Sequence, residues 1–300
     1  MRAVPADGPA VALTVAGSDS SAGAGIQADL LTMNALGVLA ATVVTAVTAQ
    51  DTLAVHAIHT VPAELVSAQL EAVLGDLPIA AVKTGMLASA STVETVARVA
   101  AEGRLPRLVV DPVLYASTGR PLLETTGVGA TYRALLPYAL VATPNLGEAA
   151  LLCGVDPGAP TDVDDLVDLA RQVLLLGPRW VLVTGGHLPG VETAAAGGAG
   201  PPTHVPDVLC DAHHVTVVDG PRVATANTHG TGCTLSAALC AGLAQGLSVP
   251  DAARQAKAYV TRALAGAATW TIGSGRGPLA HADASTVTFR ASSSPQPPPT

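Results

Sequence analysis

Residues 11–35 read VALTVAGSDSSAGAGIQADLLTMNA, and this stretch decides the fold class. The run from Val11 to Ala16 is continuously apolar, which is typical of a parallel strand covered on both faces. A turn rich in glycine, alanine and serine follows at residues 17–25, and the apolar spacing after it predicts a helix from about Ile26 to Leu36. A buried strand, a small-residue turn and a helix form the first half of a β-α-β unit.

The same alternation repeats along the chain. Further strands are predicted at residues 39–48, 79–83, 108–110, 140–142 and 180–183. Helices are predicted near residues 62–74, 89–101, 147–152, 161–174, 234–246 and 249–268. Residues 208–210 and 215–218 are expected to form a short antiparallel pair. Repeated units of this kind predict an α/β fold with a mainly parallel sheet and helices on both faces.

Composition and charge exclude several classes of protein. Hydrophobic residues make up 49% of the chain and aromatic residues only 2%, so the core is large but is built from small side chains. The net charge is -8 and no basic block occurs, which disfavours a nucleic-acid or anionic-membrane partner. The uncharged stretch 30–50 changes from helical to β-branched spacing, so it is interpreted as a helix and a strand rather than a membrane span. Four cysteines without a C-x-x-C pair, after a polar N-terminus, indicate free thiols in the cytoplasm.

The chain is predicted to form one domain over residues 11–280. Residues 1–10 are expected to be flexible, and the tail 281–300 to be disordered from about residue 291, where serine and proline dominate. Residues 189–206 are predicted to be a surface insertion around a low-complexity stretch, whose role the sequence leaves open.

The strongest local signal is the run NTHGTGCT at residues 227–234, which leads into an alanine-rich helix. Gly230 and Gly232 allow close backbone approach, and the amides of Thr231, Gly232 and Cys233 would then point outward as an anion-binding turn. At a helix N-terminus the pKa of a thiol can fall to roughly 3.5–7.5, so Cys233 is a candidate proton acceptor. The alternatives are a glycine turn that only enters a helix and a cysteine that only fills space.

Two carboxylates follow successive strands. Asp111 ends one strand and Glu148 lies just after the next, so together they could bind Mg²⁺, which needs oxygen ligands. The structural alternatives are a strand-end turn before Pro112 and a complement to a helix N-terminus. Asp29 lies among apolar residues in the first helix, which favours a buried ligand contact. Zinc spacing and a G-x-S-x-G elbow are both missing from the sequence, which disfavours metallohydrolases and α/β-hydrolases.

Taken together, these motifs resemble a known family. The matching segments are residues 16–29, 45–50, 83–87, 110–113, 143–148, 185–187 and 227–233. From about residue 12 to 278 the chain resembles the hydroxymethylpyrimidine/phosphomethylpyrimidine kinases of thiamine biosynthesis, in the ribokinase-like superfamily. The resemblance implies a three-layer α/β/α sandwich that phosphorylates an aminopyrimidine and then its monophosphate from ATP with Mg²⁺, and a cytoplasmic homodimer.

The resemblance also implies a role for each matching position. The aminopyrimidine site would comprise Gly17, Asp29, Gln50, Met86 and Val113, with Gln50 bonded to the amino group and the ring nitrogen. ATP would contact Asp111, Asn145, Thr184 and Gly186. Asn145 and Glu148 match an N-x-x-E motif that organises Mg²⁺ and phosphate, with Asp111 beside them. Residues 230–233 would form the anion hole, and Cys233 stands where sugar kinases of the superfamily carry an aspartate base.

Two positions depart from the family pattern. Thr184 replaces a lysine that is common there, which removes a positive charge from the nucleotide phosphates, and Ala22 replaces a glycine in the first turn. Two other functions stay open: a pyridoxine/pyridoxal kinase, and a non-catalytic pyrimidine-binding protein, which Thr184 suggests. The second is disfavoured because Asp111, Glu148 and the anion-hole segment are intact.

Overall fold

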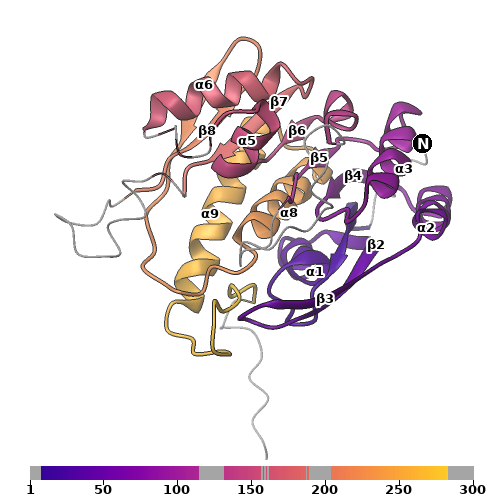
Figure 1. Ribbon diagram of the computed structural model, residues 1–300, viewed down its shortest axis with the longest axis horizontal. Helices are drawn as coiled ribbons and strands as arrows, with labels where there is room; N and C mark the ends of the chain where they lie inside the picture. Colours follow the sequence, from indigo (N-terminus) through magenta and orange to yellow (C-terminus); the bar gives the residue numbers. More distant parts are fainter. Residues whose placement is uncertain are drawn as a thin grey trace, which may run out of the picture.

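A computed structural model describes residues 8–114, 132–156, 158, 160, 162–186, 188 and 204–282. Residues 1–7, most of the predicted insertion and the tail beyond residue 282 lie outside the described residues, so the predictions made for them stay predictions. Within the described part, nine strands form one sheet in the order β3-β2-β1-β4-β5-β6-β7-β8-β9. Figure 1 shows helices on both sides of this sheet.

The predicted parallel strands are confirmed. The six strands that pair in parallel are β1 (Val11–Ser18), β2 (Leu39–Gln50), β4 (Ile79–Thr84), β5 (Val109–Val110), β6 (Val141–Ala142) and β7 (Trp180–Thr184). The antiparallel pair of β8 (Asp207–Cys210) and β9 (Val215–Val218) is also confirmed. The edge strand β3 (Val55–Thr60) was not predicted; it pairs antiparallel with β2, and most of its residues are exposed.

Helices cover both faces and give the predicted three layers. One face carries α1 (Gly25–Ala35), α8 (Thr231–Ala244) and α9 (Val249–Ala267), which share a buried apolar cluster with the inner side chains of the strands. The other face carries α2 (Ala63–Asp76), α3 (Ala90–Ala101), α5 (Leu146–Cys153) and α6 (Val163–Leu174), with a 3-10 helix, η1 (Leu136–Tyr138), near α3.

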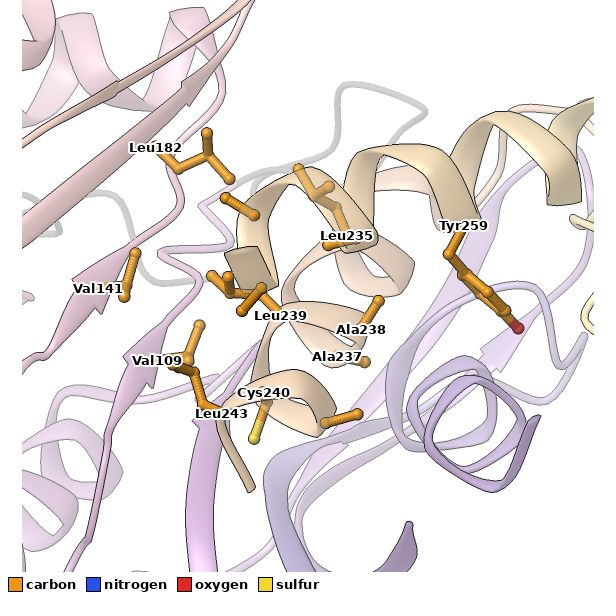
Figure 2. Close-up of a cluster of buried hydrophobic side chains, with 14 of the residues drawn as sticks. Val109, Val141, Leu182, Leu235, Ala237, Ala238, Leu239, Cys240, Leu243 and Tyr259 are labelled. Atoms are coloured by element: carbon orange, nitrogen blue, oxygen red, sulfur yellow. The ribbon is translucent and has the colours of Figure 1, made fainter. Parts of the chain in front are cut away.

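Helix α8 is the central element of the first face. Figure 2 shows its apolar side chains facing Val109, Val141 and Leu182, which come from three adjacent strands. Its other side packs on α9, where a Cβ added to Gly242 would lie 3.1 Å from the methyl carbon of Ala252. Small residues therefore let α9 approach closely, which explains the alanine-rich composition. This packing fixes the N-terminus of α8 at the carboxyl edge of the sheet, where ligands bind in open α/β folds.

Candidate active site

Residues 230–233, which the sequence predicts as an anion hole, are called the phosphoryl-binding turn after that prediction and form the start of α8. The helix begins at Thr231, three residues earlier than predicted, because Gly230 has φ +82° and turns the chain into it. The Thr231 amide donates to the carbonyl of Thr228 at 3.3 Å. Within the described residues, the amides of Gly232 and Cys233 have no backbone acceptor. Two amides, rather than the predicted three, are therefore available to an anion.

The first turn (residues 17–25) packs directly against the phosphoryl-binding turn. A Cβ on Gly230 would run into the carbonyl of Gly23, so the two backbones approach more closely than any side chain would permit. Glycine is required here by contact between two loops as well as by the positive φ at Gly230.

Asp111 and Glu148 form a buried carboxylate pair. Glu148 Oε2 accepts from the Asn145 amide and Asn145 Oδ1 from the Glu148 amide, each at 2.9 Å, a capping box that starts α5. Asp111 Oδ2 accepts from the Ser236 hydroxyl of α8 at 2.9 Å. Burial raises the pKa of Asp111 to about 6, with Lys83 opposing the shift. Burial and the charge of Asp111 together raise the pKa of Glu148 to about 8.

This pair fits a magnesium ion. A divalent cation stabilises two buried carboxylates that otherwise repel each other. Mg²⁺ in proteins is usually held by one or two carboxylates together with substrate phosphates and water. The described residues hold no group of three or more His, Cys, Asp or Glu side chains that could bind a metal on their own. A site shared with a phosphate-bearing substrate therefore suits this donor set better than an all-protein one.

A buried ion pair, which the sequence did not reveal as part of the site, lies beneath the phosphoryl-binding turn. Lys83 Nζ donates to Asp29 Oδ1 and Oδ2 at 2.9 and 2.8 Å, and both side chains are fully buried. Thr14 donates to Asp29 Oδ2 at 2.6 Å. Asp29 is therefore buried as predicted, but its partners are protein groups. Lys83 could have been noticed as one of the chain's two lysines, standing at the end of an apolar strand.

Cys233 has a different electrostatic environment from the one expected. Although Cys233 is partly exposed to solvent, burial raises the pKa of its thiol to about 12. The charge of Lys83 opposes this shift, while Asp111 and Asp29 add to it. The expectation of a pKa lowered by the helix N-terminus is thus wrong. Desolvation and two carboxylates outweigh the helix dipole and the nearby ammonium group.

Three of the predicted pyrimidine-binding residues lie together. Met86 and Ala46 belong to a small apolar cluster that Val113 packs against, and a Cβ on Gly17 would lie 3.3 Å from the Met86 sulfur. Gln50 ends β2, where the Ser20 hydroxyl holds its carbonyl at 2.7 Å and its amide at 2.8 Å. Asp29 lies apart from this cluster, in the buried ion pair.

The predicted nucleotide-binding residues lie at neighbouring strand ends. Thr184 ends β7 and bridges to Asn145, and its amide donates to the Pro144 carbonyl at 3.2 Å. The next amide, of Gly185, donates to Asp207 Oδ1 at 3.0 Å. Gly186 follows and is exposed, whereas His187 lies outside the described residues. Asp207 Oδ2 in turn accepts from Lys257 Nζ at 2.7 Å, so the second lysine of the chain supports this loop through a carboxylate.

Comparison with known proteins decides the family. Residues 19–280 match the sequence pattern of the phosphomethylpyrimidine kinase family. The chain belongs to this family. It is therefore a phosphotransferase, and the matched residues include the phosphoryl-binding turn, the carboxylate pair and residues 19–25 of the first turn. None of its described helices is both long and apolar enough to cross a membrane.

Curated relatives of this kinase family cover nearly the whole chain. The hydroxymethylpyrimidine/phosphomethylpyrimidine kinase of Rhizobium meliloti is 46% identical over 274 residues, 91% of this chain and 97% of that protein. The protein of the same name from Streptomyces coelicolor is 47% identical, covering 91% of this chain and 94% of its own length. A thiamine biosynthesis bifunctional protein of Geobacter sulfurreducens is 41% identical over 90% of this chain, which covers 51% of that protein.

Solved structures of kinases confirm the ribokinase-like α/β fold. The pyridoxal kinase of Bacillus subtilis, bound to ADP, superposes with a TM-score of 0.79 at 34% identity and covers 91% of this chain and 97% of its own. The phosphomethylpyrimidine kinase of Clostridium difficile superposes with a TM-score of 0.70 at 35% identity, covering 85% of this chain and 99% of its own.

Proposed function

We propose that this kinase transfers the terminal phosphoryl group of ATP to the hydroxymethyl oxygen of 4-amino-5-hydroxymethyl-2-methylpyrimidine. It then phosphorylates the resulting monophosphate to the diphosphate, for thiamine diphosphate biosynthesis. The names of the two relatives above 45% identity support the substrate. The observation that carries the reaction is the pair of available amides at Gly232 and Cys233, at the start of a helix whose Ser236 holds Asp111.

Phosphoryl transfer depends mainly on positioning and on neutralising charge. The amides of Gly232 and Cys233 would bind the oxygens of the migrating phosphoryl group, assisted by the N-terminal end of the helix dipole. Asp111 and Glu148 would hold Mg²⁺, which when bound neutralises negative charge on the phosphates. Asn145 holds Glu148 in place through the capping box. The loop after Thr184, including Gly186, would contact the nucleotide.

The aminopyrimidine would lie against the apolar cluster. Met86, Val113 and the bare backbone of Gly17 would face the ring, and the Gln50 carboxamide would bond its amino group and ring nitrogen. We assign Asp29 a supporting role under this site, because both of its oxygens already bond to Lys83 and Thr14. The enzyme would act as a homodimer in the cytoplasm.

Cys233 is the candidate base for the first transfer only. A hydroxymethyl group must lose a proton as it is phosphorylated, whereas the monophosphate is already largely ionised. Cys233→Ala should therefore slow the first phosphorylation far more than the second, while Cys240→Ala, seven residues along the same helix, should slow both alike. Equal losses on both substrates in Cys233→Ala would reject the assignment.

The raised pKa of the Cys233 thiol adds a second readout. Because the base must be deprotonated and its pKa is about 12, the first phosphorylation should speed up with pH across the neutral and mildly alkaline range. The second phosphorylation should lack this component, and the component should vanish in Cys233→Ala. A first step with a flat profile over that range would exclude Cys233 as the base.

A pyridoxal kinase is the second candidate. The observation that favours it is structural: pyridoxal kinases of Bacillus subtilis and Staphylococcus aureus both superpose with TM-scores of 0.79. Their identities, 34% and 30%, are lower than those of the pyrimidine kinases among the curated relatives. Competition kinetics with the aminopyrimidine and pyridoxal separates the two functions, and a higher kcat/KM for pyridoxal would overturn the proposal.

A further inference from the structure

Three segments that are far apart in the sequence meet around one imidazole. His229 stands directly before the phosphoryl-binding turn, and its Nε2 lies 2.8 Å from Asp19 Oδ2 in the first turn. The same nitrogen lies 3.1 Å from Nε2 of Gln50 at the end of β2. His229 and Asp19 are buried, with 5% and 3% of their surface exposed. The ring also fills the space beside Gly23, where a Cβ would run into it.

Asp19 fixes the hydrogen on this imidazole nitrogen. The carboxylate also accepts from the Ala24 amide at 2.9 Å and from the amide and hydroxyl of Ser21, each at 2.8 Å. Burial opposes its ionisation, but hydrogen bonds from His229 and Ser21 hold the pKa of Asp19 below its usual value. An ionised carboxylate only accepts hydrogen bonds. Since a bare Nε2 would place two acceptors in contact, Nε2 of His229 carries a hydrogen.

Counting hydrogens then decides which way round the Gln50 carboxamide lies. With Gln50 Nε2 toward the ring, two N–H donors face each other at 3.1 Å. The single hydroxyl hydrogen of Thr48 must also serve both Gln50 Oε1 at 3.3 Å and the Ser18 carbonyl at 3.0 Å. Half a turn of the carboxamide exchanges its oxygen and nitrogen and removes both conflicts. The one hydrogen on His229 Nε2 is then shared between two acceptors, Asp19 Oδ2 at 2.8 Å and Gln50 Oε1 at 3.1 Å, as a bifurcated hydrogen bond, and the NH₂ group donates to Thr48.

We propose that Asp19 and His229 are positioning residues that lock the Gln50 carboxamide in this orientation and so set the substrate specificity. One N–H and one lone pair of the carboxamide remain for a ligand. They complement an amidine edge, in which a ring nitrogen accepts and the adjacent amino group donates. An aminopyrimidine carries such an edge, whereas the ring of pyridoxine does not.

The inference rests on the proposed function, because it places Gln50 against the substrate ring. A direct test is independent of catalysis: the full chain, labelled with ¹⁵N-histidine, is examined by long-range ¹H–¹⁵N correlation. The chain has eight histidines, so the His229 signals are assigned by their loss in His229→Gln. We expect Nε2 of His229 to be protonated at pH 7.5. An Nε2 that carries no hydrogen overturns the inference.

Kinetics test the consequence for specificity. Asp19→Asn should raise KM for the aminopyrimidine about 3- to 10-fold, the loss of roughly one hydrogen bond, with kcat within about twofold. Its kcat/KM for pyridoxine should be unchanged or higher. Ser21→Ala is the matched control, since it removes a hydrogen bond from the other oxygen of the same carboxylate, and its KM should stay the same. An equal change for both substrates in Asp19→Asn, or none, overturns the inference.

A third variant separates this inference from the proposed function. Gln50→Met should raise KM for the aminopyrimidine at least as much as Asp19→Asn does. If KM is unchanged in Gln50→Met, then Gln50 does not face the substrate, and both its proposed role and this inference fail. If KM rises in Gln50→Met while Asp19→Asn has no effect, the substrate site stands and only the locking by Asp19 and His229 fails.

Discussion

Replacing Lys83 by methionine should destabilise the protein severely. The substitution keeps an unbranched side chain that is one heavy atom shorter, but it removes the ammonium group that donates to both oxygens of Asp29, at 2.9 and 2.8 Å. The Asp29 carboxylate has no exposed surface, and of these partners only the Thr14 hydroxyl would remain to it. Removing one partner of a buried ion pair typically costs about 3–5 kcal/mol.

The double variant Lys83→Met/Asp29→Leu sharpens this prediction. Replacing both members of a buried ion pair by apolar residues is often neutral or stabilising. We therefore expect the free energy of unfolding of the double variant to lie within about 1 kcal/mol of that of the parent, and to be well above that of either single variant. Guanidinium unfolding at pH 7 measures the four free energies of unfolding of this cycle. The exposed pair Arg98–Glu102 supplies a control, because Arg98→Ala should cost no more than about 1 kcal/mol.

Two results would refute this reasoning. One is a Lys83→Met variant that loses less than about 1 kcal/mol, which would show that the pair contributes little in spite of its burial. The other is a double variant as unstable as the sum of the single variants, which would show that each side chain acts through packing alone. If the double variant is stable but has lost activity, the charge of Lys83 has a catalytic effect on Cys233 and Asp111 beyond its structural one.

Three further predictions follow from particular residues. Ala22 has φ +61°, so Ala22→Gly should raise the free energy of unfolding by about 1 kcal/mol, whereas Ala24→Gly, at φ -138°, should not. Because the pKa of Glu148 is raised to about 8, the folded protein binds this proton more tightly than the unfolded chain, and its contribution to stability falls as pH rises toward 8. The rise in Tm caused by Mg²⁺ should therefore be larger at pH 8 than at pH 6, and Glu148→Gln should reduce the difference to the part that the ionisation of Asp111, with a pKa of about 6, contributes. Thr184→Lys should leave kcat unchanged or raise it, and a loss above tenfold would show that the nucleotide loop is built around threonine.

The alternation of strands and helices could be predicted from the sequence because apolar runs of distinct period follow each other along the chain. Strand β3 was not predicted because an edge strand with mostly exposed residues needs no apolar pattern. Its two histidines interrupt the apolar residues and weaken the signal further. The start of α8 was placed too late because Thr231 and Gly232 have low helix propensity, yet packing holds them in the first turn of the helix.

The chemistry of the site was harder to predict than its location. The phosphoryl-binding turn and the two carboxylates were found because each follows a strand or opens a helix. Lys83 was missed because its partner, Asp29, is 54 residues away, and only the fold brings them together. The pKa of Cys233 was predicted in the wrong direction, since a rule based on the local helix end does not include the burial and the distant carboxylates that dominate it.

The burial of α8 has a consequence for how the enzyme moves. All eleven residues from Thr234 to Ala244 are buried, and they are held between the strands and α9. Sliding or rotating α8 would disrupt the packing of all these buried side chains at once. We therefore expect the helix to stay fixed during turnover. The conformational changes that accompany binding of the nucleotide and the acceptor should therefore occur in the loops around the N-terminus of α8, and any slow conformational step should be sought in those loops.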